Sequence, residues 1–151
     1  MKISSLLQRQ HVLLDVAAAD KPALMSTFAR FLASCWSLPD PDLVLRKVLE
    51  REEEYPTGIG YAIAFPHCRL DGIDRVCMAA GRTATPVEYG AIDDKPVRLV
   101  FMFASPLGAA SVHVETLKAL STILSSEPVR AALLAASDAS VFADVIAAAE
   151  G

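Results

Sequence analysis

Residues 57–69 read Thr57-Gly58-Ile59-Gly60-Tyr61-Ala62-Ile63-Ala64-Phe65-Pro66-His67-Cys68-Arg69, a run of small and apolar side chains that ends in a histidine. The two glycines permit a tight backbone path. Larger side chains then alternate with alanines, and this period of two predicts a half-buried strand over residues 61–65. Pro66 ends that strand because proline has no N–H to donate to a neighbouring strand. We therefore expect His67 at the end of a rigid strand, with the cation of Arg69 beside it.

An imidazole held in this way can bind an anion or pass one on. The alternative is that His67 is an ordinary turn residue, because histidine is often a hydrogen-bonded polar residue in folded chains. The rest of the sequence has to decide between these two interpretations.

The composition describes one folded domain. The chain has 151 residues, of which 53% are hydrophobic and 21% charged, so we expect a single domain over residues 1–151 with a sizeable core. The net charge of −4 argues against nucleic acid as a partner, since that requires a basic face. The apolar runs are too short to span a bilayer, which predicts no direct membrane insertion. No secretory signal is visible and the three cysteines form no CxxC pair, so a cytoplasmic protein with reduced thiols is expected.

The first third of the chain predicts a strand and a helix. A short helical turn at residues 3–7 is followed by a strand over residues 12–16, in which Val12, Leu14 and Val16 share one face. Asp20 is placed to act as the N-cap of a first long helix, with a proline in its first turn.

A second helix is expected to begin at Asp40 or Asp42 and to end near Arg51-Glu52. Its inward face is formed by four apolar residues: Leu43, Val44, Val48 and Leu49. The acidic run Glu50–Glu54 is interpreted as a solvated helix end. Arg51 is the only cation in that run, and its planar guanidinium suits bidentate binding of a phosphate or carboxylate.

Beyond His67, two more strands are predicted, over residues 76–81 and 97–104. The second is almost continuously apolar, which indicates burial on both faces and therefore helices above and below the sheet. The sequence predicts an α/β fold: a single-domain layered sandwich in which helices cover both faces of a mixed, mostly parallel sheet.

The last third of the chain has helical periodicity. A helix capped by Ser111 is expected to place on one face the residues Val114, Leu117, Leu120, Ser121 and Leu124. A short helix should follow Pro128, and a last one should run from about Ser140 with four residues inward: Val141, Phe142, Val145 and Ile146.

His113 lies in the first turn of the predicted helix after residue 111. Backbone N–H groups are unpaired there and the helix dipole is positive, so a bound anion is favoured and a protonated imidazole is disfavoured. A neutral His113 can therefore donate one N–H to a phosphate. The alternative is that its ring merely packs against the preceding loop.

Four short elements together resemble a known protein family. They are Arg51-Glu52, the glycine-containing run 57–60, Pro66-His67, and His113 at the head of a leucine-rich helix. Further matches extend over nearly the whole chain, at residues 3–7, 20–21, 91–97 and 105–106. The arrangement is similar to the fructose/mannitol-type IIA domains of the bacterial phosphoenolpyruvate-dependent phosphotransferase system (PTS), and most similar to the nitrogen-regulatory IIA proteins.

This resemblance implies a phosphoryl carrier. His67 would accept a phosphoryl group from a phosphorylated HPr-like protein, His113 would be a second active-site residue, and Arg51 and Thr57 would bind the phosphate. No metal and no cofactor would be needed. The nitrogen-regulatory branch further implies regulated target proteins as partners, whereas a transport role implies a IIB component. The chemistry is consistent, because a neutral imidazole with a pKa near ~6.5 is a competent nucleophile at neutral pH.

The sequence departs from the family pattern at two positions. The family more often has glycine where this chain has Ala62 and Cys68, and neither change removes a reactive group. Cys68 does place an oxidisable thiol beside the histidine.

Four alternatives remain. The chain could be the IIA component of a fructose/mannitol-type sugar transporter, or a binding module in which Arg51, His67 and His113 survive only as a surface. A metal or cysteine–histidine enzyme would need Cys68 and Cys77, but adjacent strand residues point to opposite faces, so His67 and Cys68 pair poorly. Nucleotide binding is disfavoured because no GxxxxGK[ST] motif occurs.

Overall fold

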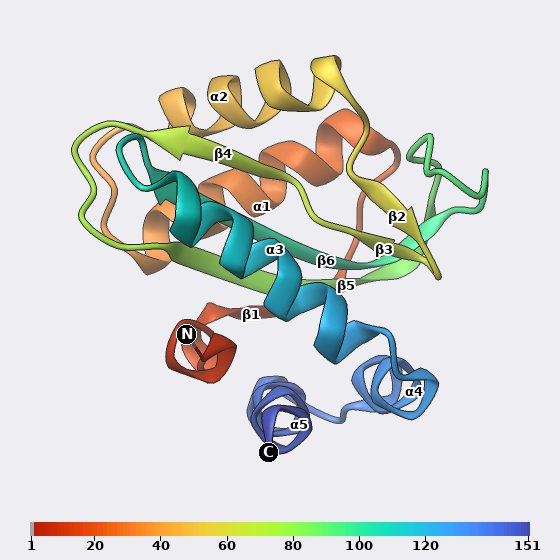
Figure 1. Ribbon diagram of the computed structural model, residues 1–151. Coiled ribbons are helices and arrows are strands. Elements are labelled where there is room, and N and C mark those ends of the chain that lie inside the picture. Colours follow the sequence, from red (N-terminus) through yellow and green to blue (C-terminus); the bar gives the residue numbers. More distant parts are fainter. Residues whose placement is uncertain (1) are drawn as a thin grey trace.

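The computed structural model describes residues 2–151. Its middle layer is a six-stranded mixed sheet (Figure 1) with the order β1-β5-β6-β3-β2, and β4 pairs with β6 beyond the end of β3. Three of the five strand pairings are parallel. The strands are β1 (Val12–Val16), β2 (Gly58–Gly60), β3 (Ile63–Ala64), β4 (His67–Leu70), β5 (Cys77–Val87) and β6 (Val97–Pro106).

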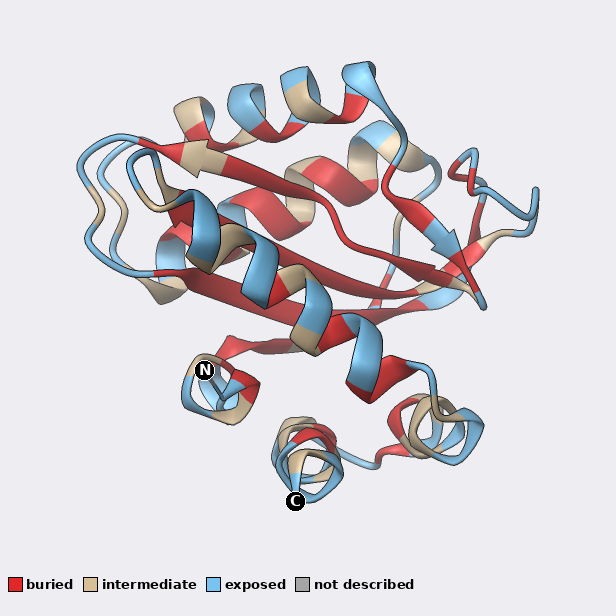
Figure 2. Ribbon diagram, viewed as in Figure 1, coloured by how far each residue is buried: buried red, intermediate tan, exposed pale blue. Residues whose placement is uncertain are grey.

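Helices cover both faces of the sheet. One face carries α1 (Lys21–Cys35) and α2 (Pro41–Glu54), and the other carries α3 (Ala110–Leu124), α4 (Glu127–Ala135) and α5 (Ala139–Glu150). Two short 3-10 helices, Ile3–Ser5 and Arg9–His11, precede β1. Each face has its own apolar cluster, and Figure 2 shows the strands buried between the helices. The predicted layered α/β sandwich is confirmed.

Aspartates begin three of the helices. The carboxylates of Asp20, Asp40 and Asp138 accept hydrogen bonds from the backbone N–H groups of Ala23, Leu43 and Val141. Each such cap stabilises its helix by about 1 kcal/mol, because it pairs an N–H that the helix leaves free. Asp20 is therefore the cap that the sequence predicts, and Asp40, not Asp42, begins the second helix.

Of the strand predicted over residues 61–65, only Ile63–Ala64 is a strand, β3. Tyr61 and Ala62 have φ angles of 56° and 63° and form the two-residue turn of a hairpin between β2 and β3. Such turns need positive φ at both positions and usually contain asparagine or glycine, so this one carried no recognisable signal. As a result, His67 does not end a strand but begins β4, after the link Phe65-Pro66.

Two predicted faces are also corrected. Asp15 has a φ of 55°, and the register between β1 and β5 shifts there, so Val16 joins the α1 side of the sheet whereas Val12 and Leu14 join the α5 side. In α2, Leu49 is 37% exposed, and the helix continues to Glu54.

The start of α3 differs from the prediction as well. The helix begins at Ala110, and Ser111 is not its cap. The face that α3 packs against the sheet also differs: Val114 and Ser121 are exposed, and the buried positions are Thr116, Leu120, Ile123 and Leu124. In α5, which begins one residue before the predicted Ser140, Val141 is exposed as well. Within residues 2–151, no helix is both long enough and apolar enough to cross a bilayer.

Candidate functional site

His67 begins β4, a short strand that pairs in parallel with β6. Its ring lies parallel to that of Phe103, its neighbour in β6, with the ring centroids 5.2 Å apart. The next residue, Cys68, belongs to the apolar cluster beneath α1 and α2. Because strand side chains alternate, His67 and Arg69 face away from that cluster. The thiol beside the histidine in sequence is therefore on the opposite face of the strand.

A single hydrogen bond determines which nitrogen of His67 is available. Its Nδ1 lies 2.7 Å from the carbonyl oxygen of Phe65. A carbonyl oxygen can only accept, so in the neutral ring Nδ1 carries the proton. Nε2 is then left with a free lone pair, which makes it the nucleophilic atom of this side chain.

His113 approaches His67 from α3. The two ring centroids are 4.9 Å apart and the ring planes are inclined at 64°. The Nδ1 atom of His113 lies 2.6 Å from the hydroxyl oxygen of Ser105, the ninth residue of β6. The backbone N–H of His113 is bonded to the carbonyl of Ala109 and is not free for an anion. The helix instead leaves free the amides that precede it, at residues 110–112.

A pocket of about 350 Å³ opens along β4 between α2 and α3. It brings together three of the residues that the sequence singled out: His67, His113 and Arg51. His67 is only 4% exposed, so its ring reaches solvent through this pocket. The remaining lining residues are Lys47, Glu50, Glu54, Cys68 and Arg69.

Burial and neighbouring cations keep both histidines neutral. Burial lowers the pKa of His67; the hydrogen bond to Phe65 and the charge of Glu52 oppose this, and the charge of Arg51 adds to it, so that the net shift is downward. Burial also lowers the pKa of His113, to about 4, with His67, Arg69 and Arg51 acting in the same direction. Both imidazoles are therefore uncharged at neutral pH.

Two arginines supply positive charge to the pocket. Arg51 lies in the last turn of α2, where its side chain donates to the carbonyl of Tyr55 at 2.9 Å. Arg69 lies two residues beyond His67 on the same face of β4, and it donates to the carbonyl of Leu107. Its Nε–H is buried and has no hydrogen-bond partner among the described residues. Arg69 was not among the predicted phosphate-binding residues, although its two-residue spacing from His67 is a signal that could have identified it.

Thr57 does not line the pocket, contrary to its predicted role in phosphate binding. It is buried, and its hydroxyl lies 2.5 Å from one carboxylate oxygen of Glu52 and 2.9 Å from the hydroxyl of Tyr89. Its backbone N–H donates to the other oxygen of Glu52 at 2.8 Å. Thr57 therefore ties the end of α2 to the β2 segment and holds the helix turn that carries Arg51.

Glu52 is an exception to the predicted solvation of the acidic run Glu50–Glu54. It is 7% exposed, and Lys21 forms an ion pair with it at 2.9 Å. The helical spacing held a signal, because Glu52 lies four residues after Val48 and continues the buried stripe of α2. The solvated part of the run is limited to its other acidic residues.

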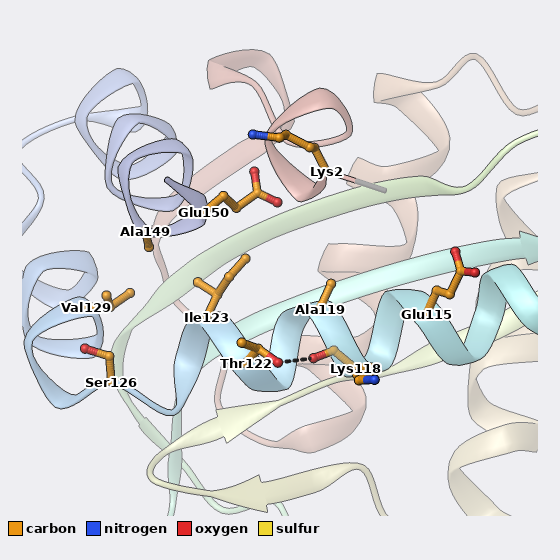
Figure 3. Close-up of a pocket in the computed structure, with 10 residues that line it drawn as sticks. All are labelled: Lys2, Glu115, Lys118, Ala119, Thr122, Ile123, Ser126, Val129, Ala149 and Glu150. Atoms are coloured by element: carbon orange, nitrogen blue, oxygen red, sulfur yellow. Dashed lines mark hydrogen bonds between the residues drawn. The ribbon is translucent and has the colours of Figure 1, made fainter.

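A larger hollow of about 630 Å³ lies elsewhere, bordered by α3, α4 and α5 (Figure 3). It contains neither histidine. Glu150 lines this hollow, and its carboxylate accepts hydrogen bonds from the backbone N–H groups of Ile3 and Ser4. This contact joins the two ends of the chain. The larger hollow contains none of the predicted site residues. Across the described part of the chain, no three His, Cys, Asp or Glu side chains are grouped so as to hold a metal ion.

Comparison with known proteins gives a consistent result. The family model described as "Phosphoenolpyruvate-dependent sugar phosphotransferase system, EIIA 2" matches residues 5–149. The fructose-specific EIIA component of Haloferax volcanii is 32% identical over 145 residues, which are 96% of this chain and 94% of that protein. The fructose-specific EIIABC component of Bacillus subtilis is 34% identical over 146 residues, which cover 97% of this chain but 23% of that longer protein. The crystal structure of the nitrogen regulatory protein IIA-Ntr from Neisseria meningitidis superimposes with a TM-score of 0.88 at 30% identity, covering 95% of this chain and 98% of that chain.

Proposed function

The chain belongs to the EIIA type 2 family of the phosphoenolpyruvate-dependent sugar phosphotransferase system, and from this membership we propose that it carries the phosphoryl group on Nε2 of His67. The observation that supports this assignment is the hydrogen bond from Nδ1 of His67 to the carbonyl of Phe65. It leaves one ring nitrogen with a lone pair, in a pocket that also contains His113 and Arg51.

The transfer needs no general base. Nε2 of His67 attacks the phosphorus of a phosphohistidine on an HPr-like donor protein, and a new N–P bond forms as the donor's N–P bond breaks. The electron pair of the broken bond returns to the donor's imidazole. Nδ1 of His67 keeps its proton throughout, and the carbonyl of Phe65 stabilises the positive charge that the ring acquires.

Other groups of the pocket stabilise the phosphoryl oxygens. The Nε2–H of a neutral His113 and the guanidinium of Arg51 are the side-chain donors. The start of α3, the helix that carries His113, adds the positive end of the helix dipole. Such donors act best when they are already in place before the phosphoryl group arrives. Thr57 contributes by positioning, through Glu52, and not by direct contact.

Phosphorylation by a labelled donor tests the proposal. Wild-type protein incubated with a phosphorylated HPr-like protein should acquire acid-labile, alkali-stable phosphate, and His67→Ala should acquire none. His11→Ala is a matched control, because His11 is also buried but stacks on Trp36 outside the pocket. Label that persists in His67→Ala, or that is lost in His11→Ala instead, would contradict the assignment.

We further propose that the carrier acts in the cytoplasm as a regulator of the nitrogen-regulatory branch. The support is the fold similarity to IIA-Ntr at 30% identity. The alternative, a IIA component that passes phosphate to a IIB component of a sugar transporter, is favoured by the fructose-specific relatives. Affinity capture with wild type, His67→Ala and His67→Asp separates the two. A regulator should retain target proteins that differ between these forms, whereas a transport component should transfer its label to a IIB protein.

A further inference from the structure

The two histidines of the pocket are anchored by the same ring atom but by different partners. Nδ1 of His67 meets a carbonyl oxygen, and Nδ1 of His113 meets the hydroxyl of Ser105 at 2.6 Å. A carbonyl only accepts a proton, whereas a hydroxyl can also donate one. Anchors of different chemistry therefore allow opposite protonation patterns in two otherwise similar rings.

We propose that Ser105 is a positioning residue that donates its O–H to Nδ1 of His113 and thereby keeps the proton of that ring on Nε2, directed at the phosphoryl group. This inference rests on the proposed function of His67. His67 would then be the ring with a free lone pair, and His113 the ring with a free N–H.

The burial of Ser105 determines the direction of this hydrogen bond. Ser105 is fully buried in β6, and within residues 2–151 its hydroxyl has His113 as its only hydrogen-bond partner. If Nδ1–H of His113 donated to the hydroxyl, the serine proton would be buried without an acceptor, which is unfavourable. If the serine donates instead, both groups are satisfied and Nε2 must carry the imidazole proton.

The charges around His113 support the same assignment. Burial, together with the positive charges of Arg69 and Arg51, lowers the pKa of His113 and so opposes protonation of both of its ring nitrogens. A ring that stays neutral has only one proton to place. The other tautomer would turn a lone pair of His113 toward the oxygens of a phosphoryl group on His67, which would repel them.

Nitrogen-15 NMR of the histidine rings tests this directly on the free protein. Wild type should show His113 with protonated Nε2 and unprotonated Nδ1, and His67 with the reverse. In Ser105→Ala the Nε2–H form of His113 should lose its dominance, while the His67 pattern is unchanged. Ser105→Thr, which retains a hydroxyl, should restore the wild-type pattern. A His113 tautomer that is the same in wild type and Ser105→Ala would overturn the proposal.

Phosphotransfer kinetics provide the functional readout. Ser105→Ala should slow phosphorylation of His67 about tenfold, and Ser105→Thr should recover part of that rate. In a His113→Ala background, Ser105→Ala should have no further effect, because Ser105 acts through His113. Thr83→Val is the matched control, since Thr83 is also fully buried in the sheet but its hydroxyl has no partner among residues 2–151. Equal slowing in Thr83→Val would show a purely structural effect.

The carrier function of His67 and the positioning role of Ser105 can be contradicted independently of each other. If wild type takes no label from any donor, the carrier function is wrong, yet the NMR experiment still tests the Ser105 hydrogen bond. If wild type is labelled and the double variant is slower than His113→Ala alone, Ser105 does not act through His113.

Discussion

Two polar clusters inside this protein contain an arginine, and they differ in how completely their groups are paired. Arg82, in β5, makes five hydrogen bonds: two to the carboxylate of Asp15 and three to the carbonyls of Leu133, Leu134 and Ala136 at the end of α4. The histidine pocket, by contrast, leaves Nε2 of both His67 and His113 and the Nε of Arg69 without a hydrogen-bond partner among residues 2–151.

This difference indicates that the Arg82 cluster stabilises the fold, whereas the histidine pocket is suited to bind a ligand. Every nitrogen of the buried Arg82 guanidinium makes at least one hydrogen bond, so this side chain holds β1, β5 and the end of α4 together. The histidine pocket keeps the buried Nε–H of Arg69 and two imidazole nitrogens without partners among residues 2–151, so a ligand that enters the pocket can pair with them. Here the unpaired groups are one nucleophile and donors that suit phosphoryl oxygens.

The strongest test of this comparison is to replace one residue of each cluster and to compare the losses of stability. Arg82→Met should lower the free energy of unfolding by about 3 kcal/mol, because it removes a paired buried cation. His67→Asn should change it by less than about 1 kcal/mol, since the Nε2 atom has no partner to lose. Urea unfolding of both variants measures the difference, and similar losses would contradict the distinction. The folded fraction of Arg82→Met should still accept phosphate.

The next largest effect is expected at His113. His113→Ala should slow phosphorylation of His67 about 100-fold, which is the usual effect of removing one preorganised donor to a developing charge. The rate is measured by single-turnover transfer from a labelled donor. The same rate in His113→Ala and wild type would show that the second histidine is only a packing residue. His11→Ala, outside the pocket, serves again as the control.

A smaller effect is expected at Arg51. Arg51→Gln should slow phosphorylation about tenfold, because one charged hydrogen bond to the phosphoryl group is lost. The pKa of His67 should also rise toward its ordinary value, since the charge of Arg51 lowers it in the wild type. NMR titration measures the second change. Arg46→Gln, an exposed cation of the same helix outside the pocket, should alter neither quantity.

A further effect is expected in the pH dependence of stability. The folded-state pKa of His113 is about 4 and that of the unfolded chain is 6.5, so unfolded protein binds more protons between these values. Stability from the pocket should therefore fall as pH falls from 6.5 to about 4. The hydrogen bond from Arg82, aided by its charge, lowers the pKa of Asp15 below 3.8, so that pair should lose stability only at lower pH. Unfolding of wild type and His113→Ala at pH 7 and pH 4.5 checks this, and equal losses in both would contradict it.

Much of the fold was predictable because it depends on local chemistry. Asp20 could be identified as a cap from its position before an apolar helical repeat, and the apolar run 97–104 indicated a doubly covered strand. The hairpin at Tyr61-Ala62 was not predictable, since its positive φ angles are imposed by pairing of β2 with β3. The bulge at Asp15 depends in the same way on Arg82, which is 67 residues away in the chain.

The sequence by itself determined the reactive groups and the order of the elements that carry them: Arg51 on a helix, His67 after a proline, His113 at the start of a helix. Only the tertiary structure decided which nitrogen of each imidazole is free. Those decisions come from the carbonyl of Phe65 and the hydroxyl of Ser105, which the parallel pairing of β4 with β6 and the packing of α3 bring within 2.7 Å and 2.6 Å of the rings. The physical reason is that a side chain's identity follows from the chain, whereas its protonation pattern follows from the atoms that fold against it.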